Sequence, residues 1–425
     1  NTADLNASFM NPIVNFEFNG SNATYSSMIH IADDVYAMAY EGDNNKATIQ
    51  TIKITAAGSV TNSSFIATEE HDDANGEYNH LVHLNGDKYV LFYRGTGSDG
   101  YAKVFKITAN GQTVEQLSSA LEFNTSDYQS GSALKMTDST LVFVYQRSSD
   151  DNMIETFKVA SDGTSITTIA ERNHDNSYGK SNSLVRADED TYILSYNGNG
   201  NDGRIQTFTI PPDGSSITEV ANAAFADNND SHHASMVQVD HDTYVNAGYS
   251  YNTSGANGRY GVLETFTIPQ DGSSITSVAT HIYSAINTGT NNQLLKLNSN
   301  EYLLAYKGSG ADGFIEMYTI SSNGQTITRK WQNKFVADSN MKPNIIRLDK
   351  NTVAVIYTGE GSDGFLQTFD IGTSDNTGPV ITSNFINYTN SLFTVELNEA
   401  AFNTNGGSGA LEVSDFVLSI SGGAA

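Results

Sequence analysis

The sequence contains no cysteine, one tryptophan and six prolines among its 425 residues. Without cysteine the chain can form no disulfide, no thiolate nucleophile and no cysteine-based zinc site. Basic residues are also scarce, because 22 Lys and Arg stand against 48 Asp and Glu and leave a formal net charge of −26. That charge repels nucleic acid and anionic membrane surfaces. No apolar run approaches the roughly 20 residues that cross a bilayer. We therefore expect no nucleic-acid partner and no membrane insertion.

A repeated segment is the strongest positive feature of the sequence. Its clearest copy, residues 89–107, returns at residues 192–210, 302–320 and 353–371, and weaker copies fill the intervals. One marker position recurs with spacings of 53, 52, 51, 52, 58 and 51 residues, and it is occupied by Tyr40, Tyr93, Tyr145, Tyr196, Gly248, Tyr306 and Tyr357. Self-similarity at such a period is typical of solenoids, propellers and related arrays.

Each copy has the pattern of four short β-strands without helical periodicity. A short apolar run comes first, then a strand dense in aromatic and β-branched residues, then a Gly-x-Gly-x-Asp-Gly loop and a third strand. An Asn-Gly or Asp-Gly turn, such as Asn110-Gly111, leads into the fourth strand. Four strands in about 50 residues predict one propeller blade. The fold class we expect is all-β, a seven-bladed β-propeller with a C-terminal partial Ig-like β-sandwich segment.

The ends of the chain suggest how the ring closes and where the propeller stops. The seventh copy lacks a fourth strand, whereas residues 12–19 end in the aromatic-then-Asn pattern of one. We expect residues 1–19 to supply a strand that closes the last blade, because an open edge would leave backbone groups unpaired. The propeller then covers residues 20–373, a linker residues 374–379, and an incomplete sandwich segment residues 380–425.

The C-terminal segment resembles the start of the bacterial Ig-like modules of long surface proteins. The resemblance rests on Asn398-Glu-Ala-Ala-Phe402 and on residues 411–423, which read LEVSDFVLSISGG. It implies a multidomain, secreted or surface-attached bacterial protein. The chain begins at Asn1 without an initiator Met or an apolar leader. We interpret this as a mature, extracellular or cell-surface chain whose leader has been removed.

The Gly-x-Gly-x-Asp-Gly loops offer candidate metal sites in five of the seven copies. Carboxylates and turn carbonyls are ligands that Ca²⁺ prefers, so Ca²⁺ is the one candidate cofactor. The alternative is structural, with Asp capping a tight turn while Gly adopts a positive φ. The candidate ligands are Asp99, Asp151, Asp202, Asp312 and Asp363.

The loops that lead into each first strand share a face with these turns and are rich in aromatic and polar residues. Aromatic rings stack on sugars, and polar side chains bond to their hydroxyls, so glycans or cell-surface polymers are the candidate partners. Polar loops beside a channel would carry similar residues without any ligand. The candidate ligand-binding residues are Tyr25, Tyr78, His80, Tyr128, Tyr178, His232 and His233.

One position of the repeat, the second-to-last residue of each first strand, is enriched in basic residues. This column of residues should lie near the opposite mouth of the channel. It could hold an anion, although ion pairing with the neighbouring Asx-rich turns is the simpler explanation. Its members are His30, His83, Lys135, Arg186, Gln238, Lys296 and Arg347.

No nucleophile, zinc or phosphate-loop motif is recognisable, which favours a non-catalytic function. The leading hypothesis is an extracellular adhesive or glycan-binding module of a larger bacterial surface protein. One alternative is a polysaccharide-degrading hydrolase or lyase with its site at the channel mouth. Glycoside hydrolysis needs a pair of carboxylates, and the 48 acidic residues offer many such pairs. A second alternative is a purely structural subunit of a surface fibre.

Overall fold

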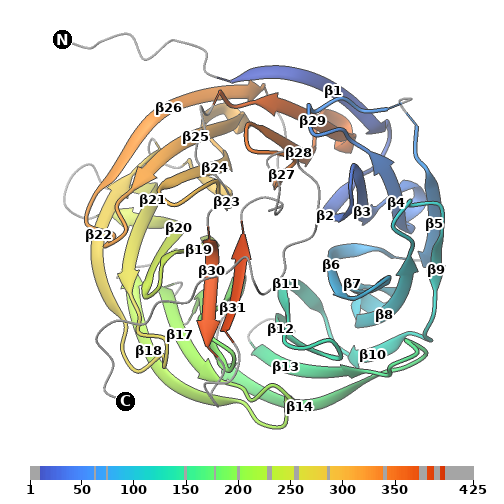
Figure 1. Ribbon diagram of the computed structural model, residues 1–425, viewed down its shortest axis with the longest axis horizontal. Helices are drawn as coiled ribbons and strands as arrows, with labels where there is room; N and C mark the ends of the chain where they lie inside the picture. The colour runs from blue at the N-terminus through green and yellow to red at the C-terminus, as the bar shows by residue number, and fades with distance from the viewer. Residues whose placement is uncertain are drawn as a thin grey trace, which may run out of the picture.

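The computed structural model describes residues 10–61, 64–72, 75–147, 151–176, 179–198, 202–226, 232–252, 258–284, 288–337, 342–372, 381–386 and 393–397. Within these ranges the chain is a seven-bladed β-propeller, as the repeat predicts (Figure 1). Seven antiparallel sheets surround a central channel, and the described regular structure contains strands and single-turn 3-10 helices only.

Each blade places its strands in chain order from the channel outwards. The innermost strands are β2 (Thr24–Ala32), β6 (Glu77–Asn85), β11 (Tyr128–Lys135), β15 (Lys180–Arg186), β19 (His232–Asp240), β23 (Thr290–Lys296) and β27 (Asn344–Arg347). The second strands are β3 (Val35–Glu41), β7 (Lys88–Arg94), β12 (Thr140–Arg147), β16 (Thr191–Asn197), β20 (Thr243–Asn252), β24 (Glu301–Lys307) and β28 (Thr352–Thr358).

The outer half of each blade carries the third and fourth strands. The third strands are β4 (Ala47–Lys53), β8 (Gly100–Ile107), β13 (Asp151–Val159), β17 (Gly203–Thr209), β21 (Gly258–Thr267), β25 (Gly313–Ile320) and β29 (Gly364–Asp370). The outermost strands of the first six blades are β5 (Ala67–Asp72), the pair β9 (Val114–Gln116) and β10 (Leu121–Asn124), β14 (Ile166–Asp175), β18 (Thr218–Ala226), β22 (Thr276–Ile282) and β26 (Ile327–Val336).

The last blade is completed from the other end of the chain. Its sheet order is β1-β29-β28-β27, in which β1 (Asn11–Asn19) lies antiparallel to β29. The register runs from Asn11 opposite Asp370 to Asn19 opposite Gly364. This pairing covers an edge that would otherwise expose a full strand of backbone donors and acceptors.

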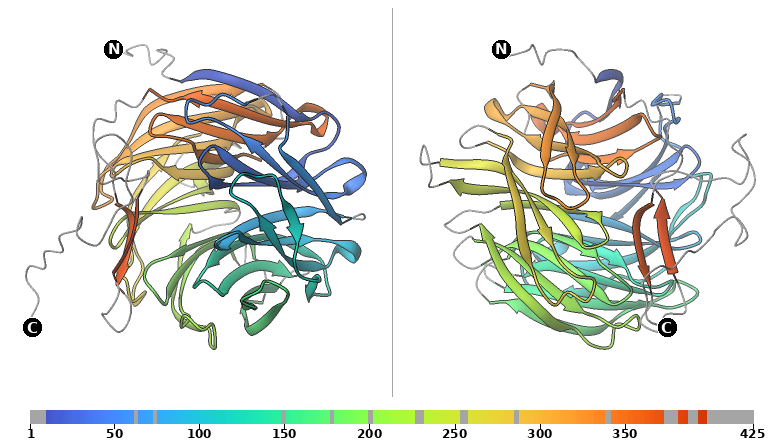
Figure 2. Two further views of the ribbon diagram at one scale, coloured as in Figure 1. Left: turned by 45° about the vertical axis from the view of Figure 1, so that its right-hand side comes forward. Right: turned by 60° about the vertical axis from the view of Figure 1, so that its left-hand side comes forward.

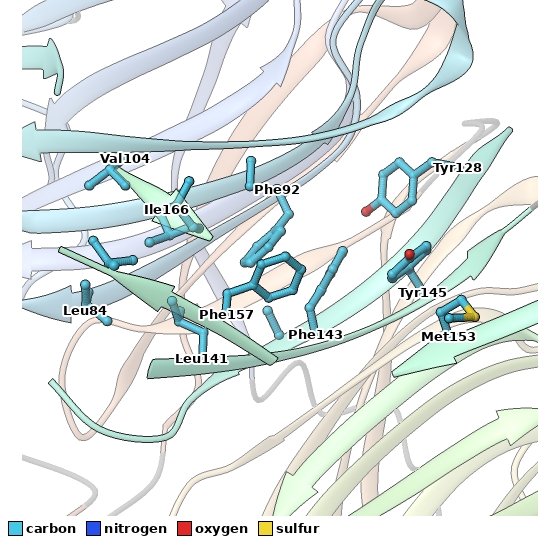
Figure 3. Close-up of a cluster of buried hydrophobic side chains, with 14 residues drawn as sticks. Leu84, Phe92, Val104, Tyr128, Leu141, Phe143, Tyr145, Met153, Phe157 and Ile166 are labelled. Carbon is cyan, nitrogen blue, oxygen red and sulfur yellow. The ribbon is translucent and has the colours of Figure 1, made fainter. Parts of the chain in front are cut away.

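The hydrophobic core is divided among the junctions between blades. Seven clusters of buried apolar side chains occur in the described part of the chain, one between each pair of neighbouring blades. Figure 3 shows the cluster between the second and third blades, where Phe92, Phe143 and Phe157 point toward one another. The rings of Phe92 and Phe143 stack with centroids 4.2 Å apart. The second strands are buried on both faces because each face meets a neighbouring blade.

A threonine hydroxyl also joins neighbouring blades at five of the junctions. A Thr in the third strand donates to the carbonyl oxygen of the glycine in the next blade's outer hairpin, at 2.6 to 2.7 Å. These pairs are Thr51 with Gly111, Thr156 with Gly214, Thr207 with Gly272, Thr265 with Gly324, and Thr368 with Gly58. All five glycines have positive φ, which explains why the repeat retains Gly in this turn.

Beyond the propeller, β30 (Ile381–Ile386) and β31 (Phe393–Leu397) form a two-stranded antiparallel sheet. β30 lies against β19, and Figure 2 shows the hairpin beside the ring of blades. The remainder of the expected sandwich segment, and the linker at 374–379, lie outside the described residues.

Candidate functional site

A repeated backbone irregularity shapes one mouth of the channel. In six blades the pairing of the innermost strand with the second strand shifts register near its start. Four residues at these shifts have a left-handed backbone, namely Tyr25 (φ 54°), Tyr78 (φ 51°), Ser181 (φ 58°) and Asn291 (φ 54°). Such a conformation costs a non-glycine residue about 1–3 kcal/mol, and conformations of this kind gather at functional sites.

The residues just after these bulges bind the inner strands to one another. The hydroxyls of four serines accept a hydrogen bond from a backbone N–H of the next blade at 2.9 to 3.2 Å, and the pairs are Ser27 with Leu81, Ser132 with Leu184, Ser183 with Met236 and Ser235 with Leu294. His80 occupies the same position in the second blade, where its Nε2 accepts from Ala133 N at 3.2 Å. The bulged residues are therefore held on a rigid ring.

The bulges surround a cavity of about 370 Å³, which we call the mouth cavity. All seven innermost strands, or the residues directly before them, contribute to its wall. Since these strands surround the channel (Figure 1), the cavity lies on the channel axis. The residues of the first, second and third blades are Tyr25, Ser26, Tyr78, Asn79, Gln129, Gly131 and Gln146. Those of the remaining blades are Lys180, Ser181, Asn182, Ala234, Asn291, Asn292, Gln293, Lys342, Pro343 and Asn344.

Two tyrosines and a lysine form one side of the mouth cavity. The ring centroids of Tyr25 and Tyr78 lie 4.3 Å apart. The Nζ atom of Lys342 is 4.1 Å from the centre of the Tyr25 ring and 5.9 Å from that of Tyr78. Desolvation of this ammonium lowers the pKa of Lys342, and the nearby charge of Lys307 adds to the effect while Glu77 opposes it. The aromatic rings stabilise the charged ammonium group, but burial lowers its pKa and makes Lys342 a stronger acid than an ordinary lysine.

The wall of the mouth cavity is also rich in carboxamides. Asn182 is only 9% exposed, and neither its Oδ1 nor its Nδ2 atom has a hydrogen-bond partner among the described residues. Asn79 is 7% exposed; its Nδ2 donates to Gly76 O at 2.5 Å, whereas its Oδ1 has no partner there. Buried polar groups are nearly always hydrogen-bonded, so an orphaned carboxamide facing a cavity is what a ligand or ordered water would satisfy.

The acidic groups near the mouth are engaged by other side chains. Glu77 and Asp127 both form ion pairs with Arg94, at 2.6 and 2.8 Å. Glu41 accepts a hydrogen bond from the Thr24 hydroxyl at 2.5 Å, and burial raises its pKa. These ion pairs and this hydrogen bond stabilise the segments next to the bulged residues Tyr25 and Tyr78.

The structure brings together some of the ligand-binding residues predicted from sequence. Tyr25 and Tyr78 line the mouth cavity, and Tyr128 is fully buried behind them with its hydroxyl donating to Tyr78 O at 3.2 Å. Tyr128 therefore supports the backbone of Tyr78, and the His80 side chain contacts the backbone of the next blade at Ala133. Burial lowers the pKa of His80 to about 4, so it stays neutral.

Three of the predicted ligand-binding residues cannot be placed at the site. Tyr178 lies outside the described residues, as do the side chains of His232 and His233 at the start of β19.

The candidate calcium ligands lie in separate blades. Asp99, Asp202, Asp312 and Asp363 each accept, through their backbone oxygen, a hydrogen bond from the glycine that opens their loop, at 2.7 to 3.0 Å. The carboxylate of Asp312 pairs with Lys334 at 2.6 Å, and that of Asp151 with Arg147 at 3.2 Å. In the part of the chain that the structure describes, no three His, Cys, Asp or Glu side chains are grouped to hold a metal. Calcium binding at these loops stays a prediction.

At the other channel mouth the basic column mainly binds backbone carbonyls. His30, His83, Arg186, Gln238 and Arg347 contact carbonyl oxygens of the turn that follows their own strand, at 2.7 to 3.2 Å, and Lys296 donates to Val239 O at 3.0 Å. Lys135 forms an ion pair with Asp138 at 2.7 Å. The described contacts of this column therefore include capping of turns as well as an ion pair of the expected kind.

Sequence reasoning missed the polar residues of the mouth cavity. Lys342, Asn182 and Asn291 stand two or three residues before the apolar run of their innermost strands, at the positions of Tyr25 and Ser26 in the first copy. A comparison of these two columns across all seven copies would have found them. The sequence analysis drew attention only to the copies that carry Tyr or His in this loop.

Comparisons with known proteins establish the fold. No protein-family model matches the chain, and no curated protein matches it either. A putative 6-phosphogluconolactonase from Bacteroides fragilis has 15% identity and a TM-score of 0.52, with 73% of this chain and 84% of that chain covered. The periplasmic gluconolactonase of Pseudomonas aeruginosa has 12% identity and a TM-score of 0.55, over 82% and 97%. Sqt1 from Chaetomium thermophilum, solved with the N-terminus of a ribosomal protein, has 10% identity and a TM-score of 0.50, over 91% and 97%.

These comparisons correct the leading hypothesis drawn from the sequence. The adhesive, non-catalytic module is wrong, because these three similar propellers are two lactonases and a protein that binds a ribosomal protein, and none of the three is an adhesin. At such low identity the likeness itself defines the fold alone. Among the described residues no helix is long and apolar enough to cross a membrane.

Proposed function

We propose that the chain is a carbohydrate-directed hydrolase whose site is the mouth cavity, and that its substrates are sugar lactones, the cyclic esters of polyhydroxy acids. One observation carries the proposal: a lysine of lowered pKa and an asparagine whose buried carboxamide has no described partner line the same cavity. Perturbed titratable groups beside convergent polar groups in a cleft are a recognised mark of catalytic sites. The lactonase names of two propellers of this fold support the same choice of ester chemistry.

The residues of the cavity suit the steps of lactone opening. The rings of Tyr25 and Tyr78 cover the apolar face of the sugar, while Asn182 Oδ1 accepts a hydrogen bond from the attacking water. Water adds to the carbonyl carbon, and the Lys342 ammonium stabilises the oxyanion that develops. When the ring C–O bond breaks, Lys342 protonates the leaving alkoxide and regains a proton from the added water. The lowered pKa makes this transfer easier than from an ordinary lysine.

The test is hydrolysis of glucono-1,5-lactone, followed by acid release and corrected for the spontaneous reaction. We expect Lys342→Met to lower kcat by about 10²–10⁴-fold, the range typical of a lost acid–base group. Lys330→Met is the matched control, because Lys330 is an exposed lysine on the outer strand β26. No catalysis above background on aldonolactones by the wild-type chain would exclude the proposal.

We also propose an extracytoplasmic location and a C-terminal Ig-like module. An acidic, cysteine-free chain suits export, and the gluconolactonase from Pseudomonas aeruginosa is itself described as periplasmic. The hairpin of β30 and β31 is compatible with the opening strands of a sandwich. Fractionation of the native host, with an antibody against the propeller, tests the location; a cytoplasmic pool alone would refute it.

A further inference from the structure

Two polar side chains interrupt the apolar core between the fourth and fifth blades. At this junction the second strands carry Ser195 on β16 and Asn246 on β20, and both residues are 0% exposed. The same two positions of the repeat carry apolar residues of one buried cluster at each of the other six junctions. These pairs are Ala39 with Leu91, Phe92 with Phe143, Val144 with Leu194, Ala247 with Leu304, Ala305 with Val355, and Ile356 with Met38.

The pairing of the strands places Ser195 and Asn246 at the same level of this junction. Ser195 lies directly opposite Ser183 of the innermost strand β15. Asn246 lies directly opposite Met236 of the innermost strand β19. The hydroxyl of Ser183 accepts a hydrogen bond from Met236 N at 2.9 Å, so these two inner residues are in contact across the junction. Since residues directly opposite in antiparallel strands share a face, Ser195 and Asn246 point into the junction one strand outward from this contact.

The polar atoms of these two side chains lack hydrogen bonds. Ser195 Oγ, Asn246 Oδ1 and Asn246 Nδ2 are all buried without a partner among the described residues. Buried polar groups are nearly always hydrogen-bonded, so a ligand is required to satisfy them. A carboxamide has donors and an acceptor, and a hydroxyl can do either, so the ligand must both donate and accept. A bare cation would bond to the oxygens only and leave the amide donors unsatisfied.

A buried carboxyl group lies beside Asn246 on the same face. Glu264 of β21 is directly opposite Asn246 and is 7% exposed. In the third and sixth blades the hydroxyl of the marker tyrosine donates to the glutamate at this position, at 2.5 and 2.6 Å. The fifth blade has Gly248 at the marker position, so this donor is missing. The described hydrogen bond of the Glu264 side chain comes instead from the Ser277 hydroxyl at 2.6 Å.

We propose that the junction between the fourth and fifth blades is a binding site for ordered water, in which at least one water molecule bridges Ser195 and Asn246. Water is the smallest ligand that both donates and accepts hydrogen bonds. A further bond to the Glu264 carboxyl replaces the donor that a tyrosine supplies in other blades. Internal water molecules make about two to four hydrogen bonds, which these three side chains can provide. The site lies outward from the wall of the mouth cavity and is independent of the proposed hydrolase.

Oxygen-17 relaxation dispersion tests the inference, because it counts long-lived internal water molecules in solution. The wild-type chain is compared with the double variant Ser195→Ala/Asn246→Leu, whose new side chains are those that other blades carry at the same positions. We expect the double variant to lose at least one long-lived water molecule. Thr209→Val, on the neighbouring strand β17, is the control and should lose none. If the double variant does not fold, Asn246→Leu alone provides the same comparison.

A high-resolution crystal structure of the wild-type chain locates the ligand. Density for a water molecule within hydrogen-bond distance of both Ser195 Oγ and the Asn246 carboxamide would support the inference. Equal numbers of long-lived water molecules in the wild type and the variant would overturn it. Direct hydrogen bonds from both side chains to other protein groups, or density for a larger solute between them, would also overturn the assignment to water.

Discussion

The hydroxyl of Thr368, in the last blade, donates to the carbonyl oxygen of Gly58, in the first blade, across 2.6 Å. Thr368 and Gly58 are 310 positions apart in the chain, yet they repeat a contact that other blades make with their immediate neighbours. The junction between the ends of the chain therefore has the same contact as four junctions between blades that are adjacent in sequence.

The threonine contact should contribute measurably to stability. Thr207 is a good test because its hydroxyl donates to Gly272 O at 2.7 Å and accepts from Ala221 N at 3.0 Å. Thr207→Val keeps the shape but leaves both buried backbone groups without a partner. We expect a loss of about 1–3 kcal/mol in the free energy of unfolding, measured by urea denaturation. Thr209→Val on the same strand should change it by less than about 0.5 kcal/mol. Equal effects of the two substitutions would show that the contact is neutral.

Removing the terminal strand should destabilise the whole ring. Deletion of residues 1–19 removes β1, its entire pairing with β29, and the buried side chain of Phe18. We expect a large fall in Tm and increased aggregation, because the deletion exposes a strand edge of the last blade. Deletion of residues 1–9 alone leaves the β1–β29 pairs in place and is the matched control. An unchanged Tm in the longer deletion would contradict the closure mechanism.

Buried glutamates should make the stability fall as pH rises. Glu155 is 2% exposed, and burial raises its pKa from 4.5 to about 7, so the folded state holds a proton that the unfolded state has lost. Such a group costs nothing below pH 4.5; its cost grows between pH 4.5 and 7 to about 3 kcal/mol at most. Glu155→Gln keeps an acceptor for the Tyr145 hydroxyl, which donates to Glu155 at 2.5 Å.

Thermal melts at pH 5 and pH 8 measure this effect. Relative to wild type, Glu155→Gln should gain Tm at pH 8 and little at pH 5. The exposed Glu115→Gln should show the same small difference at both values. A gain at pH 5 as large as that at pH 8 would rule out titration of Glu155 as the cause.

The fold was predictable because its signal is repeated. Seven copies of one pattern, with tyrosine at the marker position in six, leave little freedom in strand number or order. The seven-bladed all-β architecture is confirmed. Glycine in the outer hairpin was predictable from turn chemistry, but its contact with a threonine of the previous blade was not, since that needs the relative placement of two blades.

The site was predictable only in part, for a physical reason. Binding residues of a propeller differ from blade to blade, so the repetition that reveals the fold hides the site. Tyr25 and Tyr78 were conspicuous as aromatic rings, whereas Lys342 and Asn182 resemble ordinary polar loop residues until the bulges bring them to one cavity. The role of His80 depends on its reach to Ala133 of the next blade.

Asn182 should reveal a conflict between stability and activity. A carboxamide that is 9% exposed and has no described partner costs about 1–3 kcal/mol of stability. Asn182→Leu keeps the branched shape and the number of side-chain heavy atoms and removes this cost, so we expect a higher Tm together with loss of lactone hydrolysis and of sugar binding. Thr209→Val is the control, because it leaves the cavity untouched. Asn110→Leu is not a suitable control, because Asn110 bonds within its own turn. If Asn182→Leu instead lowered Tm, the carboxamide would be part of the scaffold, and the case for a ligand at this position would fail.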